Sequence, residues 1–349
     1  MDDRRLVAGF NEHVRAKRVK AIRRAERSAS KVAARQVARQ QSLLLSFTRK
    51  FLLAAALGIL AISLVPEAWF EPLNRLTALL VGDLIQLLGL KPVVQGAYIS
   101  TGGFSVNVIA ECSAVQLMIL YAAFIVAFPA TRSEQWIGLG AGTALLFTVN
   151  IARIATIILI GWKSPAWFEP AHVYFGQLGM LLATVAICLL WCHWISNADR
   201  IDGPAGFCLR FLIFSSLPFI FWIHLNRLYI SAIDALIDWI FRLNSLQLVI
   251  PRTHDLYYQT FSLIALGGML MAFKAAGLAL RLRWMALGFL ALTLFQVAFR
   301  LCNVWITAFQ IGWLAPLSQV VYNICVYALP LAVVLRFLFK MRVQREPTV

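Results

Sequence analysis

The sequence predicts an all-α integral membrane protein with about eight transmembrane helices, outer interfacial amphipathic helices and a short extracytoplasmic β-hairpin. Hydrophobic residues make up 60% of its 349 residues, charged residues only 14%, and the mean hydropathy is +0.75. Soluble domains are nearer half apolar and a quarter charged, so this much apolar surface needs lipid around it. Long apolar runs and an uneven distribution of Lys and Arg are the two further observations that support this fold class.

The amino-terminal arm, residues 1–48, is basic. Residues 1–50 hold 14 Lys or Arg against 4 Asp or Glu, which leaves a net charge of +10. The arm has a helical composition but is too polar to enter a bilayer, and its charge suits anionic lipids of the cytoplasmic leaflet. A solvated helical tail is the alternative interpretation. Nucleic-acid binding is not expected, because aromatic residues for base stacking are nearly absent from the arm.

Apolar runs predict the spans and loop charges predict their orientation. The predicted spans are 49–65, 113–130, 136–160, 173–194, 207–224, 257–274, 284–305 and 314–338. With eight spans, the basic arm and the loops that carry Arg132, Arg200, Arg281 and Arg342 all fall on one side. Because Lys and Arg favour the cytoplasmic side, both termini are expected there. We expect a catalytic membrane domain at 49–195 and a second four-span module at 207–339.

Two outer segments are expected to lie on the membrane surface as amphipathic helices, residues 73–90 and 225–248. Inserting the first one would reverse every later loop and violate the charge rule. Between residues 92 and 109, alternating residues and a Thr101-Gly102-Gly103 turn predict a short hairpin. In the second segment, Asp234 and Asp238 share one helix face, which we interpret as solvated.

An internal repeat is one interpretation of this layout, with chance similarity as the alternative. Leu-Asn-Arg-Leu occurs at 73–76 and again at 225–228. The third span of each half carries one arginine, Arg153 and Arg300. We interpret Arg300 as structural or as a relic of a duplication, because no Cys or His on neighbouring spans matches it.

Three reactive side chains are predicted to reach the outer membrane surface together: Cys112, Arg153 and His172. A nearby cation raises the thiolate fraction of a cysteine, and an imidazole can carry the proton to a leaving amine. An arginine fork suits an oxyanion or a carboxylate. Each residue also has a simpler explanation: an inert thiol, an interfacial histidine, or an arginine that extends to the surface.

Metal or cofactor binding is not predicted. Cys188, Cys192 and His193 form the only ligand-like cluster, at the cytoplasmic end of the fourth span. A structural zinc site has four protein ligands, and no fourth ligand lies nearby in the sequence.

The chain resembles the exosortase/archaeosortase family of membrane cysteine transpeptidases over about residues 50–195. The resemblance is carried by Ala110-Glu111-Cys112-Ser113-Ala114-Val115-Gln116, then Asn150-Ile151-Ala152-Arg153-Ile154, then His172. It implies that Cys112 is the nucleophile, Arg153 a stabiliser of the transition state or thiolate, and His172 the general acid/base. It also implies supporting roles for Glu111, Ser113 and Asn150. Ala114 stands where the family usually has glycine, and Gln116 where a basic residue is common.

The resemblance implies a cysteine peptidase/transpeptidase of the hydrolase class in a bacterial inner membrane. Its partners would be exported proteins that end in a short motif, a transmembrane helix and a basic tail, together with an unknown surface acceptor. The active site would face the periplasm. The alternative is a multi-span transporter or flippase, in which Arg153 and Arg300 line a path for an anionic substrate. A scaffold recruited through its basic arm is a third interpretation.

Overall fold

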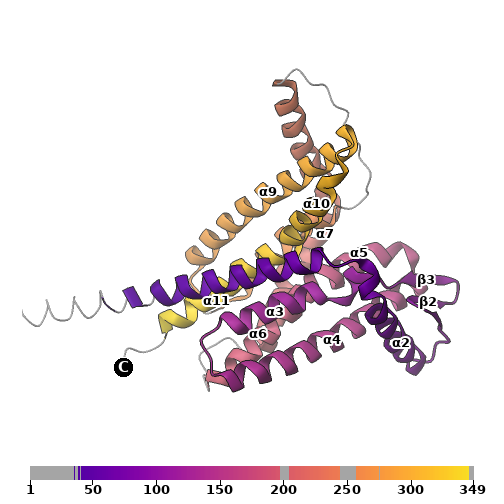
Figure 1. The fold of residues 1–349 in the computed structure, drawn as a ribbon, viewed down its shortest axis with the longest axis horizontal. Coiled ribbons are helices and arrows are strands. Elements are labelled where there is room, and N and C mark those ends of the chain that lie inside the picture. The colour runs from indigo at the N-terminus through magenta and orange to yellow at the C-terminus, as the bar shows by residue number, and fades with distance from the viewer. Residues whose placement is uncertain are drawn as a thin grey trace, which may run out of the picture.

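The protein is a helical membrane protein with a small sheet at one end (Figure 1). A computed structural model describes residues 35, 38–39, 41–196, 204–243, 257–274 and 276–345. Within them, six helices are long and apolar enough to cross a membrane, and two shorter apolar helices, Val115–Ala127 and Tyr258–Ala272, accompany them. The described part is therefore that of a multi-pass α-helical membrane protein. Most of the predicted basic arm, residues 1–48, lies outside the described residues.

The first half is a helical bundle. Its elements are the helix Gln41–Ser63, η1 (Glu67–Phe70), α2 (Glu71–Leu87), η2 (Ala110–Ser113), α3 (Val115–Ala127), α4 (Arg132–Lys163), η3 (Pro165–Trp167), α5 (Phe168–Val173), the π-helical segment η4 (Tyr174–Gly179) and α6 (Met180–Ser196). Helix α4 starts at a capping box between Thr131 and Glu134. Its 32 residues extend about 48 Å, more than the hydrocarbon core requires.

A three-stranded antiparallel sheet lies beside α2 at one end of this bundle (Figure 1). Its strands are β1 (Val93–Gln95), β2 (Tyr98–Thr101) and β3 (Phe104–Asn107). The second turn lies at Gly102 and Gly103, both at positive φ, where the sequence predicted its hairpin. The indole of Trp162 covers Gly102 so closely that no side chain fits there. The sheet thereby packs against the carboxy-terminal end of α4.

The second half departs from the predicted break between a span and an interfacial helix. One continuous helix, α7 (Pro204–Leu243), covers the predicted span 207–224 and most of the segment 225–248, whose last residues lie outside the described ones. Pro218 lies inside α7, where it removes only one backbone hydrogen bond. The remaining elements are η5 (Tyr258–Phe261), α8 (Ser262–Ala272), α9 (Leu278–Phe309), η6 (Gly312–Leu314), α10 (Ala315–Asn323), the π-helical segment η7 (Ile324–Ala328) and α11 (Leu329–Arg345).

The two halves share an order of elements from η2 and from η5 onward. Each has a 3-10 turn, a short apolar helix, a 32-residue helix, a second 3-10 turn and a last helix interrupted by a π-helical segment. They meet where α6 packs against α7, α8 and α11. The rings of Phe47 and Phe339 stack 4.3 Å apart in the shared core. This order agrees with the internal repeat that Arg153 and Arg300 suggested.

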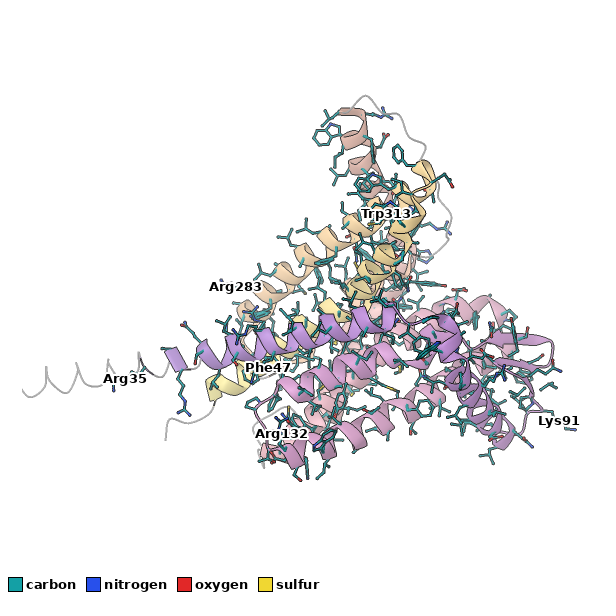
Figure 2. All side chains as sticks on the ribbon, in the orientation of Figure 1. Arg35, Phe47, Lys91, Arg132, Arg283 and Trp313 are labelled. Carbon is teal, nitrogen blue, oxygen red and sulfur yellow. The ribbon has the colours of Figure 1, made fainter. Side chains whose placement is uncertain are left out.

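Basic side chains mark one end of the bundle. Arg35, Arg132 and Arg283 lie toward one end, whereas Lys91 lies at the opposite end beside the sheet (Figure 2). By the charge rule, the first end is expected to be cytoplasmic and the sheet end outer.

Candidate active site

Cys112 sits in the 3-10 turn η2, immediately before α3. Its thiol is free and half-buried against the apolar cluster formed by α2, the sheet and α4. Ala114, two residues later, has φ +57°, a left-handed conformation that is unfavourable for any residue except glycine. Its conformation gives a physical reason for the glycine usual at this position in the family that the sequence resembles. The turn presents Cys112 at the head of α3 and ends the extended segment from the sheet.

Asn150 connects this turn to Arg153. Its side chain is fully buried. The Asn150 Nδ2 donates to the backbone carbonyl of Cys112 at 2.7 Å, and its Oδ1 accepts from Arg153 Nη1 at 3.0 Å. The Arg153 Nε is buried without a hydrogen-bond partner among the described residues. Arg153 therefore has hydrogen-bonding capacity left over in a half-buried setting.

His172 approaches Arg153 from α5, across the first residues of the π-helical segment. A methyl group built on Gly176 would lie 3.0 Å from Arg153 Nη2 and 3.6 Å from His172 Cδ2. Both side chains thus border the space that the missing Cβ leaves. The structure therefore brings Arg153 and His172 together and ties Arg153 to the Cys112 turn through Asn150.

The second half contributes a residue that sequence reasoning missed. Tyr258 of η5 presents its ring to His172, with 6.0 Å between centroids and an interplanar angle of 86°. Its hydroxyl donates to the carboxylate of Glu169. On the other side, Phe168 stacks on His172 at 5.8 Å. These contacts hold the imidazole from two sides, and no local sequence signal marks Tyr258, 89 residues away from Glu169.

The other predicted site residues are placed as follows. The Ser113 hydroxyl is buried and donates to the Ala110 carbonyl at 2.6 Å within the turn, so it stabilises the turn. For Glu111 the structure describes the backbone, and its side chain lies outside the described part. The side chains of Cys188 and Cys192 are buried. Within the described residues, no group of three His, Cys, Asp or Glu side chains gathers closely enough to hold a metal ion.

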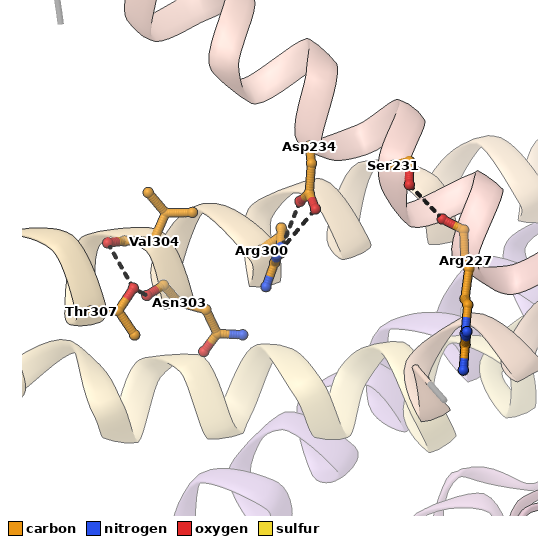
Figure 3. A network of polar contacts seen from close by, with 7 residues as sticks. All are labelled: Arg227, Ser231, Asp234, Arg300, Asn303, Val304 and Thr307. Carbon is orange, nitrogen blue, oxygen red and sulfur yellow. Dashed lines mark hydrogen bonds and ion pairs between the residues drawn. The ribbon is translucent and has the colours of Figure 1, made fainter. Parts of the chain in front are cut away.

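The second half holds the corresponding arginine in a closed setting (Figure 3). Arg300 on α9 forms a buried two-contact ion pair with Asp234 on α7, through its Nε at 2.6 Å and Nη2 at 3.1 Å. The prediction that Asp234 lies on a solvated face is therefore wrong, because the carboxylate is needed to neutralise Arg300. Asp238 pairs with Arg242 on the surface, at 2.9 Å. This pairing agrees with a structural role for Arg300.

Residues 41–192 match the family model for transmembrane exosortase (Exosortase_EpsH). This match confirms the resemblance to the exosortase family over residues 41–192. The family suggests membrane transpeptidase function. The match ends before α7, so the second half lies outside it. No curated protein and no solved structure matches the chain.

Proposed function

We propose that the protein is an exosortase-type membrane cysteine peptidase/transpeptidase. It cleaves the carboxy-terminal sorting tail of exported proteins and transfers them to an acceptor at the cell surface. The observation that carries this proposal is the chain of contacts from the Cys112 turn through Asn150 to Arg153, with His172 beside it. These residues come from η2, α4 and α5, all within the segment that matches the family.

Cys112 is the proposed nucleophile. His172 takes the thiol proton, and the sulfur attacks the scissile carbonyl to form a C–S bond and an oxyanion. When the oxyanion collapses, the C–N bond breaks and His172 returns the proton to the leaving amine. The sorting tail leaves with a free amino group, and the exported protein remains as a thioester on Cys112. An acceptor nucleophile then releases it.

Arg153 is the proposed stabiliser. Its guanidinium stays charged at all relevant pH values and can donate two parallel hydrogen bonds to a developing oxyanion. Asn150 fixes the guanidinium relative to the Cys112 carbonyl, so both groups keep one geometry before substrate arrives. Such fixed donors are most effective where water is largely excluded, as at the lipid boundary.

The proposed setting is the inner membrane of a bacterium, with both termini in the cytoplasm and the site on the periplasmic side. The position of Arg35, Arg132 and Arg283 at the end opposite the sheet, where Lys91 lies, supports this orientation. The proposed substrates end in a short motif, a transmembrane helix and a basic tail, and anionic lipids bind the basic arm. The basic tail of such a substrate would stay in the cytoplasm by the same charge rule.

A transporter that uses both arginines finds less support. Arg300 already directs Nε and Nη2 at Asp234 inside the protein. An anionic cargo would have to displace a buried carboxylate from this pair, which is costly.

Co-expression with a tailed reporter protein tests the proposal. We expect Cys112→Ala to abolish processing, and Cys302→Ala, which removes another partly exposed thiol in α9, to leave processing intact. Processing is read as loss of the tail on a gel, with protein amount and membrane insertion matched. Equal processing by wild type and Cys112→Ala would refute the assignment.

A further inference from the structure

A polar pocket lies between the two halves, next to the Cys112 turn. Its volume is about 220 Å³, enough for a small organic group. The first half contributes the end of helix Gln41–Ser63 and the segment to Phe70, together with Ala110, Val115 and Gln116 from η2 and the start of α3. The second half contributes Gln319 and Asn323 from α10. The pocket wall thus includes residues on both sides of Cys112 in the sequence.

Two buried oxygen atoms in the pocket lining have no donor. Asn323 is 3% exposed, and its Oδ1 has no hydrogen-bond partner among the described residues. The Oγ of Ser63, which also lines the pocket, has none either. Leaving a buried acceptor unpaired is unfavourable, and native structures rarely do so without a ligand or water. The exposed carboxylate of Glu67 adds a third acceptor to the same pocket.

We propose that this pocket binds the acceptor nucleophile of the transfer step, a small amine or hydroxyl group that donates hydrogen bonds. The lining fits this class because Ser63, Glu67 and Asn323 carry oxygen acceptors. The acceptor nucleophile must also reach the acyl group on Cys112, and Ala110 and Val115, close to Cys112 in the chain, form part of the pocket wall. The inference rests on the proposed function and gives the second half a role in it, since α10 supplies Gln319 and Asn323.

The transfer step balances without a further reagent. The nitrogen or oxygen of the acceptor attacks the thioester carbonyl of the acylated Cys112, and a C–N or C–O bond forms. The C–S bond breaks, and the thiolate takes up the proton that the acceptor loses. Water in the same place gives hydrolysis instead.

Partitioning of a model acyl-enzyme tests the pocket. Purified full-length protein in detergent micelles is acetylated with p-nitrophenyl acetate, and the burst of p-nitrophenolate that Cys112→Ala lacks counts the acyl-enzyme. Ethanolamine is the amine probe and glycerol the hydroxyl probe. The ratio of transferred acetyl product to acetate is measured against probe concentration. In wild type we expect saturation with at least one probe, and saturation by glycerol alone assigns the acceptor as a hydroxyl compound.

Two variants decide the outcome. We expect Asn323→Leu and Gln319→Leu to lower the transfer-to-hydrolysis ratio about fivefold, as the loss of one hydrogen bond predicts. Gln319 is exposed, so its variant keeps the test valid if Asn323→Leu fails to fold. Ser318→Ala, on the same helix but bonded to Asn303, is the matched control. An unchanged ratio in a folded variant, or an equal drop in Ser318→Ala, overturns the pocket alone. Absence of a Cys112-dependent burst overturns the proposed function and the pocket with it.

Discussion

The two halves place corresponding residues in opposite environments. Cys112 and Thr260 are each the third residue of a 3-10 turn, but Cys112 is half-buried and Thr260 is fully buried. The Thr260 hydroxyl donates to the Tyr257 carbonyl at 2.8 Å and accepts from Trp222 at 2.9 Å. Arg300 is held by a carboxylate of its own protein, whereas Arg153 has no ion pair in the part of the chain that the structure describes.

A shared support makes the contrast informative. In each half a buried amide on the 32-residue helix donates to a carbonyl of the 3-10 turn: Asn150 to Cys112 at 2.7 Å, and Gln296 to Gln259 at 2.8 Å. The backbone arrangement is therefore common to both halves. The halves differ in whether other side chains of the protein pair with the polar groups around this arrangement. The second half pairs its arginine with Asp234, and the first leaves the Nε of its arginine without a hydrogen-bond partner among the described residues.

The largest expected effect is on stability in the second half. Replacing Arg300 with Leu leaves Asp234 buried and charged without a partner, so the free energy of unfolding should fall by about 3–5 kcal/mol. The double variant Arg300→Leu/Asp234→Leu should recover most of this loss, because it removes both charges. Thermal unfolding in detergent micelles measures both. If Arg300→Leu were as stable as wild type, the ion pair would not contribute to stability in this way.

The next effect is on rate in the first half. Arg153→Lys keeps the charge but loses the planar fork, so we expect the cleavage rate to fall about 100-fold or more with little change in stability. Arg75→Lys, on the surface of α2 and paired with Glu71, is the control and should keep the wild-type rate. Initial rates on the tailed reporter give the answer. A full rate for Arg153→Lys would mean that charge alone is needed there.

A smaller effect is expected where the second half touches the site. Tyr258→Phe removes the hydrogen bond to Glu169 while keeping the ring against His172. Because hydrogen bonds to charged groups contribute about 1.5–3 kcal/mol and only part of this is expected to reach the transition state, the rate should fall about tenfold. Tyr174→Phe removes a hydroxyl contact to Ser216 that also joins the halves, 3.0 Å long but away from His172. That control should leave the rate within twofold, and an equal loss in both variants would indicate a general loosening of the interface.

Sequence reasoning reached the membrane class because its signals are local, and the roles of Cys112, Arg153 and His172 stay predictions. Apolar runs indicate helices one at a time, and Arg153 stands out among apolar neighbours. The break predicted within α7 was wrong for a physical reason. The polar residues around Arg227 change which face of the helix is polar, but they do not interrupt its backbone hydrogen bonds.

Pairings between distant residues could not be read from the sequence. Asp234 and Arg300 are 66 residues apart, and Tyr258 and Glu169 are 89 apart. An amphipathic pattern shows that Asp234 shares a polar face, but it cannot show whether water or another helix covers that face. For the same reason the sequence does not indicate the pocket. The Oδ1 of Asn323 without a donor points to a ligand only once the burial of this side chain is known.

The smallest expected effect concerns the glycines of the π-helical segment. Gly176→Ala adds a methyl group 3.0 Å from Arg153 Nη2, so the guanidinium must shift and the rate should fall about threefold, near 0.7 kcal/mol. Gly179→Ala meets nothing closer than 3.5 Å and should leave the rate unchanged. Both substitutions favour helix, so stability should not fall in either. Rates of the two variants on the tailed reporter, compared side by side, separate crowding of Arg153 from any effect of stiffening the segment. Equal rates for Gly176→Ala and Gly179→Ala would place Arg153 away from the reacting group. The functional difference between the two halves would then rest on Cys112 and Thr260 alone.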